Sequence, residues 1–139
     1  MRSEVFADTG AWIASSVSRD ALHTIAVTTY RDLLRQGRVL VTTNLVVAET
    51  YTAIYRAGGR APALRFLDLL RASARVRKVY SDAALEDKAE EILVRYADQD
   101  FSFVDAVSFA IMRAHGIQEA FAFDHHFLTA GFTLVPGSR

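Results

Sequence analysis

Short apolar segments alternate with longer amphipathic segments along this chain, and this alternation restricts the folds that are open to it. The apolar segments, which we expect to be strands, cover residues 4–7, 39–42, 76–80, 120–123 and 132–135. The segments between them predict helices at about 20–36, 44–58, 62–74, 82–96 and 102–115, and a helical turn within 125–130. Strands that alternate with helices of this length are typical of an α/β fold, in which a mainly parallel central sheet is flanked by α-helices.

Residues with strong positional preferences set the expected ends of these elements. Asn44 and Ser102 are suitable N-caps for the helices that follow them, and Pro62 suits a first helical turn. Gly116 is expected to stop the helix that begins after Ser102. Thr9-Gly10 is expected to form the turn that leads out of the first strand.

Length and composition fit a single domain spanning residues 1–139. The chain is 51% apolar, which is enough for a substantial core. It contains no cysteine, so disulfides and thiolate metal sites are excluded, which suits a reducing compartment. The N-terminus lacks a signal-peptide layout because Asp8 interrupts its first apolar run, and no apolar stretch is long enough to span a bilayer. We therefore expect a cytoplasmic protein with no membrane contact.

The formal net charge of zero conceals an uneven distribution of charge along the chain. Seven basic residues and one acidic residue lie between Arg56 and Lys78, whereas eight acidic and two basic residues lie between Asp82 and Asp105. This separation predicts a basic surface able to attract a polyanion, although a solvated helix face explains it equally well. The preference for arginine over lysine permits contact with nucleic acid, and biased base composition of the genome also explains it.

Four acidic residues stand within or directly after mainly apolar segments of the chain. They are Asp8, Glu49, Asp105 and Asp124. Asp8 and Asp124 end expected strands, whereas Glu49 and Asp105 enter helices that begin at the same edge of the sheet. Right-handed crossovers place such strand-to-helix turns along one edge, where ligands bind. Carboxylates that converge there repel one another, and a divalent cation such as Mg²⁺ or Mn²⁺ relieves that repulsion.

Each of these acidic residues also has a purely structural explanation. Asp8 could cap the turn that follows it, and Asp124 could cap the short helix after it. Asp105 follows Ser102 at the spacing of a capping box, so it could be a cap, a metal ligand or both. Glu49 has mainly apolar neighbours on its helix face, where a solvated glutamate would normally have polar neighbours.

The adjacent histidines His125 and His126 give only weak support to a zinc site. Neighbouring residues on a helix do not face one another, and no third histidine stands at ligand spacing. We therefore expect oxygen ligands and a hard cation at the sheet edge.

Five short motifs of this chain match those of a known protein family in residue type, order and spacing. They are Asp8-Thr9-Gly10-Ala11, Asn44-Leu45-Val46-Val47-Ala48-Glu49-Thr50, Ser102-Phe103-Val104-Asp105-Ala106, Phe123-Asp124-His125-His126-Phe127 and Gly131-Phe132-Thr133-Leu134. On these motifs the whole chain resembles the PIN domain and, within it, the VapC-type toxins of bacterial and archaeal toxin–antitoxin pairs.

The resemblance implies a metal-dependent ribonuclease that binds Mg²⁺ or Mn²⁺ and hydrolyses phosphodiester bonds in RNA. It implies that the acidic set is both catalytic and metal-binding, with the fourth member acting directly or through water: Asp8, Glu49, Asp105 and Asp124. It implies supporting roles for Thr9 and Ser102. The partners that it implies are an RNA substrate, a small protein antitoxin that blocks the acidic pocket, and a second copy of the chain in a homodimer.

Other functions of α/β domains fit the sequence less well. Haloacid-dehalogenase-like enzymes require an Asp-x-Asp pair after the first strand, but position 10 is glycine. Receiver domains require a lysine near the last strands, and both lysines, Lys78 and Lys88, lie elsewhere. A PIN-like module that binds RNA or protein without catalysis stays open as the alternative, although the intact acidic set argues against it.

Overall fold

Five strands form one parallel sheet in the computed structural model, which describes residues 3–137. The strands are β1 (Glu4–Ala7), β2 (Val39–Thr43), β3 (Val76–Val79), β4 (Glu119–Phe121) and β5 (Thr133–Val135). Their order in the sheet is β3-β2-β1-β4-β5, and every neighbouring pair is parallel. The predicted α/β fold with a parallel central sheet is therefore confirmed.

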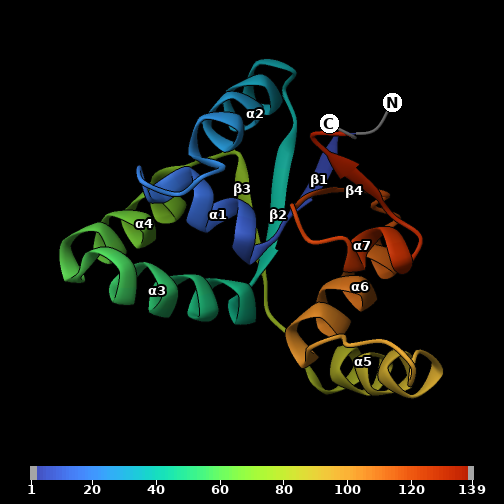
Figure 1. Ribbon diagram of the computed structural model, residues 1–139. Helices are drawn as coiled ribbons and strands as arrows, with labels where there is room; N and C mark the ends of the chain where they lie inside the picture. Colours follow the sequence, from blue (N-terminus) through green and yellow to red (C-terminus); the bar gives the residue numbers. More distant parts are fainter. Residues whose placement is uncertain (1–2, 138–139) are drawn as a thin grey trace.

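Helices flank this sheet on two sides. They are α1 (Thr9–Ser16), α2 (His23–Arg35), α3 (Asn44–Gly58), α4 (Arg60–Ala72), α5 (Ala83–Arg95), α6 (Phe103–His115) and α7 (His126–Thr129). Figure 1 shows α1 to α4 gathered on one side of the strands and α5 to α7 on the other. Within the described part of the chain, no helix has the length and apolar character that crossing a membrane requires.

The strand order creates a switch point between β1 and β4. The chain moves from β1 outward through β2 to β3, and then returns past β1 to add β4 and β5 on the other side. Right-handed crossovers in these two directions place their helices on opposite faces, which is the arrangement in Figure 1. In open α/β sheets, ligands bind beyond the carboxyl ends of the strands at such a point.

Helix α1 was not predicted, and the expected turn at Thr9-Gly10 is wrong. The helix starts at Thr9, directly after Asp8. Trp12 of this helix is 1% exposed and packs edge-on against Tyr30 and Phe66, with ring centroids 6.1 and 5.8 Å away. Tertiary packing thus stabilises a helix whose glycine and serines give it little helical preference of its own.

Helix α3 is capped by Thr43 and not by the predicted Asn44. Thr43 Oγ1 accepts a hydrogen bond of 3.0 Å from the backbone N–H of Val46. Asn44 is the first helical residue, and its Oδ1 accepts a hydrogen bond of 2.8 Å from the backbone N–H of Ser81. The Asn44 side chain therefore ties the start of α3 to the segment between β3 and α5.

The remaining boundaries differ from the predicted ones by a few residues. Helix α4 spans Arg60–Ala72, so Pro62 lies in its first turn as predicted, and the helix ends slightly before the predicted Ala74. Strand β4 ends at Phe121 and not at Phe123, so Asp124 does not end a strand. It lies instead in the segment that joins β4 to α7.

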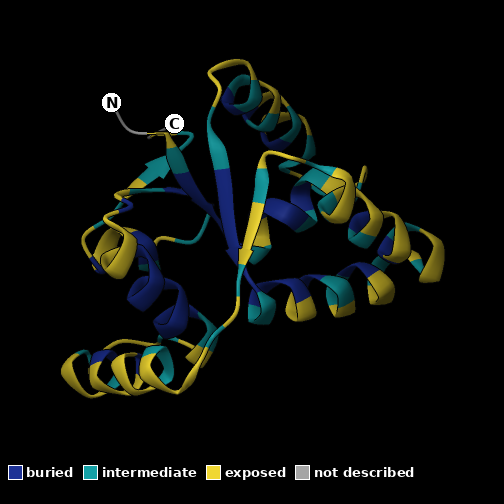
Figure 2. Cartoon of the chain, turned by 180° about the vertical axis from the view of Figure 1, so that it is seen from behind, coloured by how far each residue is buried: buried dark blue, intermediate teal, exposed yellow. Residues whose placement is uncertain are grey.

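Strands β1 and β2 and helix α6 form the buried centre of the fold, as Figure 2 shows. Every residue of α6 from Asp105 to Met112 is buried. Phe109 packs against the rings of Phe101, Phe127 and Phe132, with centroid separations of 5.0, 4.9 and 5.7 Å. This packing fixes α6, and with it the position of the helix start at the sheet edge.

We expect Phe109→Ala to lower the free energy of unfolding by about 3–5 kcal/mol, because it removes a buried ring that contacts other aromatic rings. Urea unfolding measures this loss. Phe103→Ala is the matched control in the same helix, because Phe103 is 39% exposed. This variant should lower the free energy of unfolding by less than about 1 kcal/mol. Equal losses in the two variants would contradict this description of the core.

Candidate active site

The four predicted acidic residues come together at the carboxyl edge of the sheet. Asp8 directly follows β1, Glu49 lies in α3, Asp105 lies in the first turn of α6, and Asp124 lies between β4 and α7. The negative charges of Asp105, Asp124 and Glu49 all act on Asp8. The four side chains thus lie near the β1/β4 switch point, as the parallel topology led us to expect. Among the described residues, Asp105 and Asp124 are the two members of this set that form, with His126, a group of three side chains whose ligand atoms all lie within 4.8 Å of one another.

Asp8 is the most strongly perturbed member of this set. It is only 6% exposed, and burial raises the pKa of its carboxyl from 3.8 to about 7. The Thr9 backbone N–H opposes this shift, whereas the neighbouring carboxylates add to it. Asp8 occupies the N-cap position of α1 but makes no side-chain capping hydrogen bond. Capping therefore does not explain why an acidic residue stands here.

Asp105 combines a structural role with a place in the cluster. Its backbone N–H donates to Ser102 Oγ, and its Oδ2 accepts from the Ser102 backbone N–H, each at 3.0 Å. The capping box that the spacing suggested is therefore present. Oδ2 also lies 3.2 Å from His126 Nδ1. The cap fixes the Asp105 carboxylate while it faces the other acidic residues.

Asp124 and His126 complete a compact group with Asp105. The Asp124 Oδ1 atom accepts a hydrogen bond of 2.9 Å from the His126 backbone N–H and lies 3.4 Å from His126 Nδ1. One ligand atom of each of Asp105, Asp124 and His126 lies within 4.8 Å of the others. These atoms are therefore close enough to bind one metal ion.

His126 is a site residue that the sequence reasoning missed. The expectation that the two histidines do not face each other is wrong, because His125 precedes the helix and the two rings lie with centroids 4.9 Å apart. The His125 side chain is 79% exposed and that of His126 only 17%, so His126 is the one that reaches into the site. The short spacing from Asp124 to His126 at the start of α7 is the signal that could have identified it.

Glu49 differs from the expectation drawn from its apolar neighbours. Its side chain is exposed rather than buried, so burial does not strain its charge. Thr9 Oγ1 donates a short hydrogen bond of 2.6 Å to Glu49 Oε1 and orients the carboxylate. Thr9 donates to Glu49 through its hydroxyl, and Ser102 donates to Asp105 through its backbone N–H, so both predicted supporting residues contact acidic members of the set.

The chemistry of this set fits a divalent cation. Carboxylate oxygens are the ligands that Mg²⁺ and Mn²⁺ prefer. Burial and repulsion hold Asp8 partly protonated at neutral pH. A cation bound among these carboxylates would remove that repulsion and favour the ionised form.

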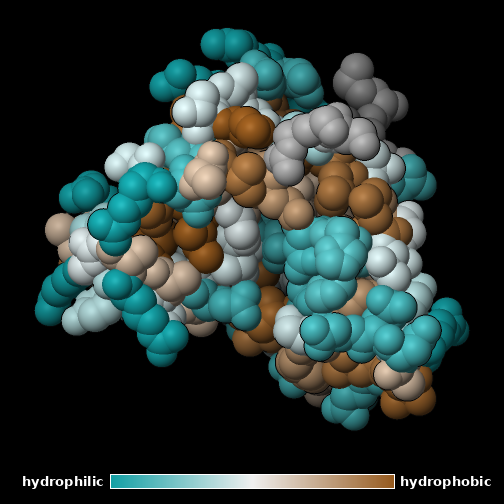
Figure 3. Space-filling view, in the orientation of Figure 1, coloured by the Kyte–Doolittle hydropathy of each residue, from teal (hydrophilic) through white to brown (hydrophobic). Residues whose placement is uncertain are grey.

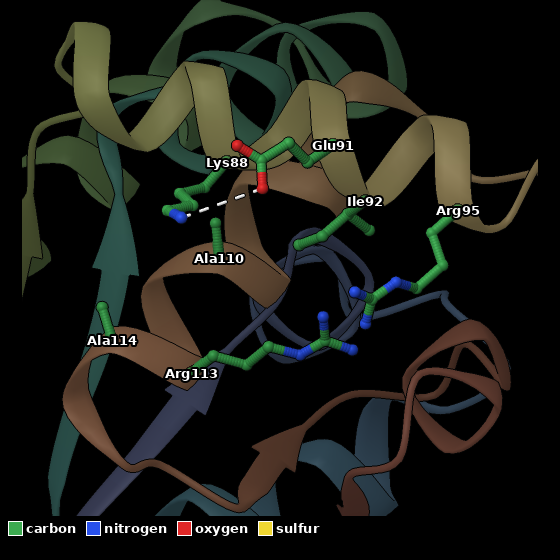
Figure 4. Close-up of a pocket in the computed structure, with 7 residues that line it drawn as sticks. All are labelled: Lys88, Glu91, Ile92, Arg95, Ala110, Arg113 and Ala114. Atoms are coloured by element: carbon green, nitrogen blue, oxygen red, sulfur yellow. Dashed lines mark ion pairs between the residues drawn. The ribbon is translucent and has the colours of Figure 1, made fainter.

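A separate pocket of about 320 Å³ lies between α5 and α6. Figure 4 shows the side chains of Arg95 and Arg113 pointing into it, next to an ion pair of 3.8 Å between Lys88 and Glu91. It is lined by Lys88, Glu91, Ile92, Arg95, Ala110, Arg113 and Ala114. None of these residues belongs to the acidic set, so this pocket lacks the ligands that the sheet edge supplies.

We expect Asp8→Asn to stabilise the metal-free protein. Because the folded pKa of about 7 exceeds the unfolded value of 3.8, ionisation of Asp8 removes stability as the pH rises between these values. In EDTA the variant should exceed wild type by roughly 1–4 kcal/mol near pH 8, and the gap should close towards about pH 4. Urea unfolding at several pH values measures the gap.

The matched control for this measurement is Asp87→Asn, which changes an exposed aspartate of α5. It should leave the stability nearly unchanged, within about 0.5 kcal/mol at every pH. An Asp8→Asn effect that did not vary with pH would show that the buried charge is not its cause.

Comparison with known proteins agrees with this geometry. A PIN domain profile matches residues 5–132. The chain is 40% identical over 131 residues to the 23S rRNA-specific endonuclease VapC20 of Mycobacterium tuberculosis, from strains CDC 1551 / Oshkosh and ATCC 25618 / H37Rv. The alignment covers 94% of this chain and 97% of that protein.

A solved structure gives the same result for the fold. The crystal structure of Mycobacterium tuberculosis VapC20, described as a sarcin–ricin loop cleaving toxin, superposes with a TM-score of 0.85 at 40% sequence identity. The match covers 93% of this chain and 96% of that chain. Sequence profile, full-length relative and fold agree, and the chain therefore belongs to the PIN domain family.

Proposed function

We propose that this chain is a metal-dependent endoribonuclease and the toxin of a toxin–antitoxin pair. The observation that carries the proposal is the gathering of four carboxylates, two of them buried, near the switch point of a PIN domain. The relative that shares 40% identity over nearly the full length is named as an rRNA-specific endonuclease. A shared fold alone would not support a shared activity, but a shared fold with an intact acidic site does.

The proposed roles of the residues follow from their contacts. The acidic set holds Mg²⁺ or Mn²⁺: Asp8, Glu49, Asp105 and Asp124. Thr9 fixes the Glu49 carboxylate, and Ser102 fixes that of Asp105. Both positioning contacts are hydrogen bonds from the start of a helix, and they orient the two carboxylates in the proposed site.

Hydrolysis of a phosphodiester requires water to attack phosphorus while the bond from phosphorus to a ribose oxygen breaks. A divalent cation at this site supplies charge stabilisation for the phosphoryl oxygens and lowers the pKa of water. The carboxylates that face the site accept hydrogen bonds from the attacking water and hold it in line with the leaving oxygen. Water is the nucleophile, so no covalent intermediate with the protein forms.

We propose that the substrate is a loop of ribosomal RNA. The supporting observation is the name of the relative, which acts on 23S rRNA, and the description of its crystal structure as a sarcin–ricin loop cleaving toxin. Proteins that recognise RNA by sequence mostly read unpaired loops, where bases are accessible. A ribosomal substrate would place the enzyme in the cytoplasm.

A basic surface that spans the end of α3, α4 and β3 is suited to hold the RNA backbone. All seven basic residues between Arg56 and Lys78 are exposed, and Figure 3 shows hydrophilic side chains projecting from the α3–α4 side. Arg71 and Lys78 line a groove together with Val47 of α3, the helix that carries Glu49. Cations in this position can bind phosphates that flank the cleaved bond.

We also propose that a small protein antitoxin covers the acidic site and that the chain forms a homodimer. The supporting observations are the VapC name of the relative and the exposed apolar surface on α3 and α4, which includes Tyr55, Leu64 and Leu69. Exposed apolar side chains on neighbouring helices are available for contact with another protein.

In a cleavage assay on a synthetic sarcin–ricin stem-loop, Asp8→Asn and Asp105→Asn should each lower the single-turnover rate by about 100-fold or more, because each removes a charge that holds the cation. Excess EDTA should abolish cleavage, and added Mg²⁺ or Mn²⁺ should restore it. The control Asp87→Asn should cleave at the wild-type rate. Wild-type rates in either site variant, or in EDTA, would reject the proposal, and binding without cleavage would favour the non-catalytic alternative.

The double variant Arg71→Gln/Lys78→Gln should weaken RNA binding in EDTA and flatten its salt dependence. Loss of two phosphate contacts should reduce the slope of log K against log salt by about 1.4, since each contact to single-stranded nucleic acid contributes about 0.7. Arg31→Gln/Arg35→Gln on α2 is the charge-matched control and should leave the slope unchanged. An equal effect in both double variants would indicate non-specific attraction only.

A further inference from the structure

Several contacts hold the side chain of His126 at the acidic site. Its backbone N–H is bonded to Asp124 Oδ1 at 2.9 Å, which fixes the residue at the start of α7. Its ring packs edge-on against Phe101, with centroids 5.2 Å apart. Phe127, the next residue, is fully buried in the core. The imidazole therefore has little freedom to turn away from the carboxylates.

The Nδ1 atom of His126 lies where a metal ligand would be expected. It is 3.2 Å from Asp105 Oδ2 and 3.4 Å from Asp124 Oδ1. Ligand atoms that bind one ion at about 2.0–2.3 Å and at right angles to each other are about 3 Å apart. Nδ1 thus lies at the separation of a neighbouring ligand from each of the two carboxylate oxygens, and one ligand atom of each of the three residues lies within 4.8 Å of the others.

An imidazole ligand changes which cation such a site prefers. Mg²⁺ binds oxygen almost exclusively, whereas Mn²⁺ and later transition-metal ions also accept imidazole nitrogen. A site with carboxylates alone binds Mg²⁺ and Mn²⁺ with little selectivity between them. One nitrogen ligand would raise the affinity for Mn²⁺ relative to that for Mg²⁺.

We propose that His126 binds the active-site cation through Nδ1, together with Asp105 and Asp124, so that the site selects Mn²⁺ or a similar transition-metal ion over Mg²⁺. This inference rests on the proposed metal-dependent function and specifies its cofactor. As a ligand, His126 is neutral, with its proton on Nε2. Asp8 and Glu49 then complete the site with oxygen ligands or through water.

A role in positioning alone is the competing explanation, because Nδ1–H could simply donate to the two carboxylates. The variant His126→Asn separates the two roles. Its side-chain NH₂ can donate to Asp105 and Asp124 from about the same place, but it has no imidazole nitrogen to bind a metal. His125→Asn is the matched control, since His125 is the adjacent residue and its side chain is 79% exposed.

The test is pulsed electron paramagnetic resonance of Mn²⁺ bound to the whole protein, with natural-abundance and ¹⁵N-histidine samples, combined with calorimetric titration of Mn²⁺ and Mg²⁺. We expect a histidine nitrogen coupling in wild type and His125→Asn and none in His126→Asn. We also expect His126→Asn to weaken Mn²⁺ binding by about 10- to 100-fold and Mg²⁺ binding by less than about 3-fold.

Each other outcome has a definite meaning. Bound Mn²⁺ without histidine coupling in wild type would overturn the inference and leave the metal-dependent function intact. A coupling that persists in His126→Asn would also overturn it. Failure of wild type to bind either ion would reject the proposed function together with the inference. If His126→Asn does not fold, the labelled wild-type spectrum still decides.

Discussion

The burial of Asp8 among other carboxylates is the constraint on which this site depends. A carboxyl that is 6% exposed and faces Asp105, Asp124 and Glu49 ionises only at a cost, which is why its pKa rises to about 7. Protonation relieves the cost by removing the charge, and a divalent cation relieves it by neutralising the charge. A buried aspartate with a raised pKa at a ligand-binding edge points to a functional site.

The fold imposes this arrangement at the cost of local electrostatic strain. Parallel pairing of β1 with β2 and β4 brings the end of β1 next to the segment after β4, and so places Asp8 beside Asp124. Helix α6 is buried from Asp105 to Met112, and its packing in the core fixes the position of Asp105. Because the strands and α6 are held by the aromatic core, the acidic residues cannot separate to relieve their repulsion. Stability and chemistry are therefore coupled through the same elements.

The sequence was sufficient to predict the sheet and the placement of the four acidic residues near one edge of it, because both follow from the order of strands and helices. The parts that it did not reveal depend on contacts between distant residues. Helix α1 forms because Trp12 packs against Tyr30 and Phe66, and no local pattern encodes those partners. Glu49 is exposed because no other element of the described chain buries that face of α3, which its neighbours in the sequence do not reveal. The His126 side chain points towards the carboxylates because its backbone N–H is bonded to Asp124 and its ring packs on Phe101.

The most direct test of this arrangement is an anomalous difference map from crystals grown with Mn²⁺. If the four carboxylates form one cation site, the map should show a strong peak within ligand distance of Asp8, Asp105 and Asp124, at about 2.0–2.3 Å from the nearest side-chain atoms. Absence of a peak there at saturating Mn²⁺, or an ordered ion only at another place, would contradict the assignment.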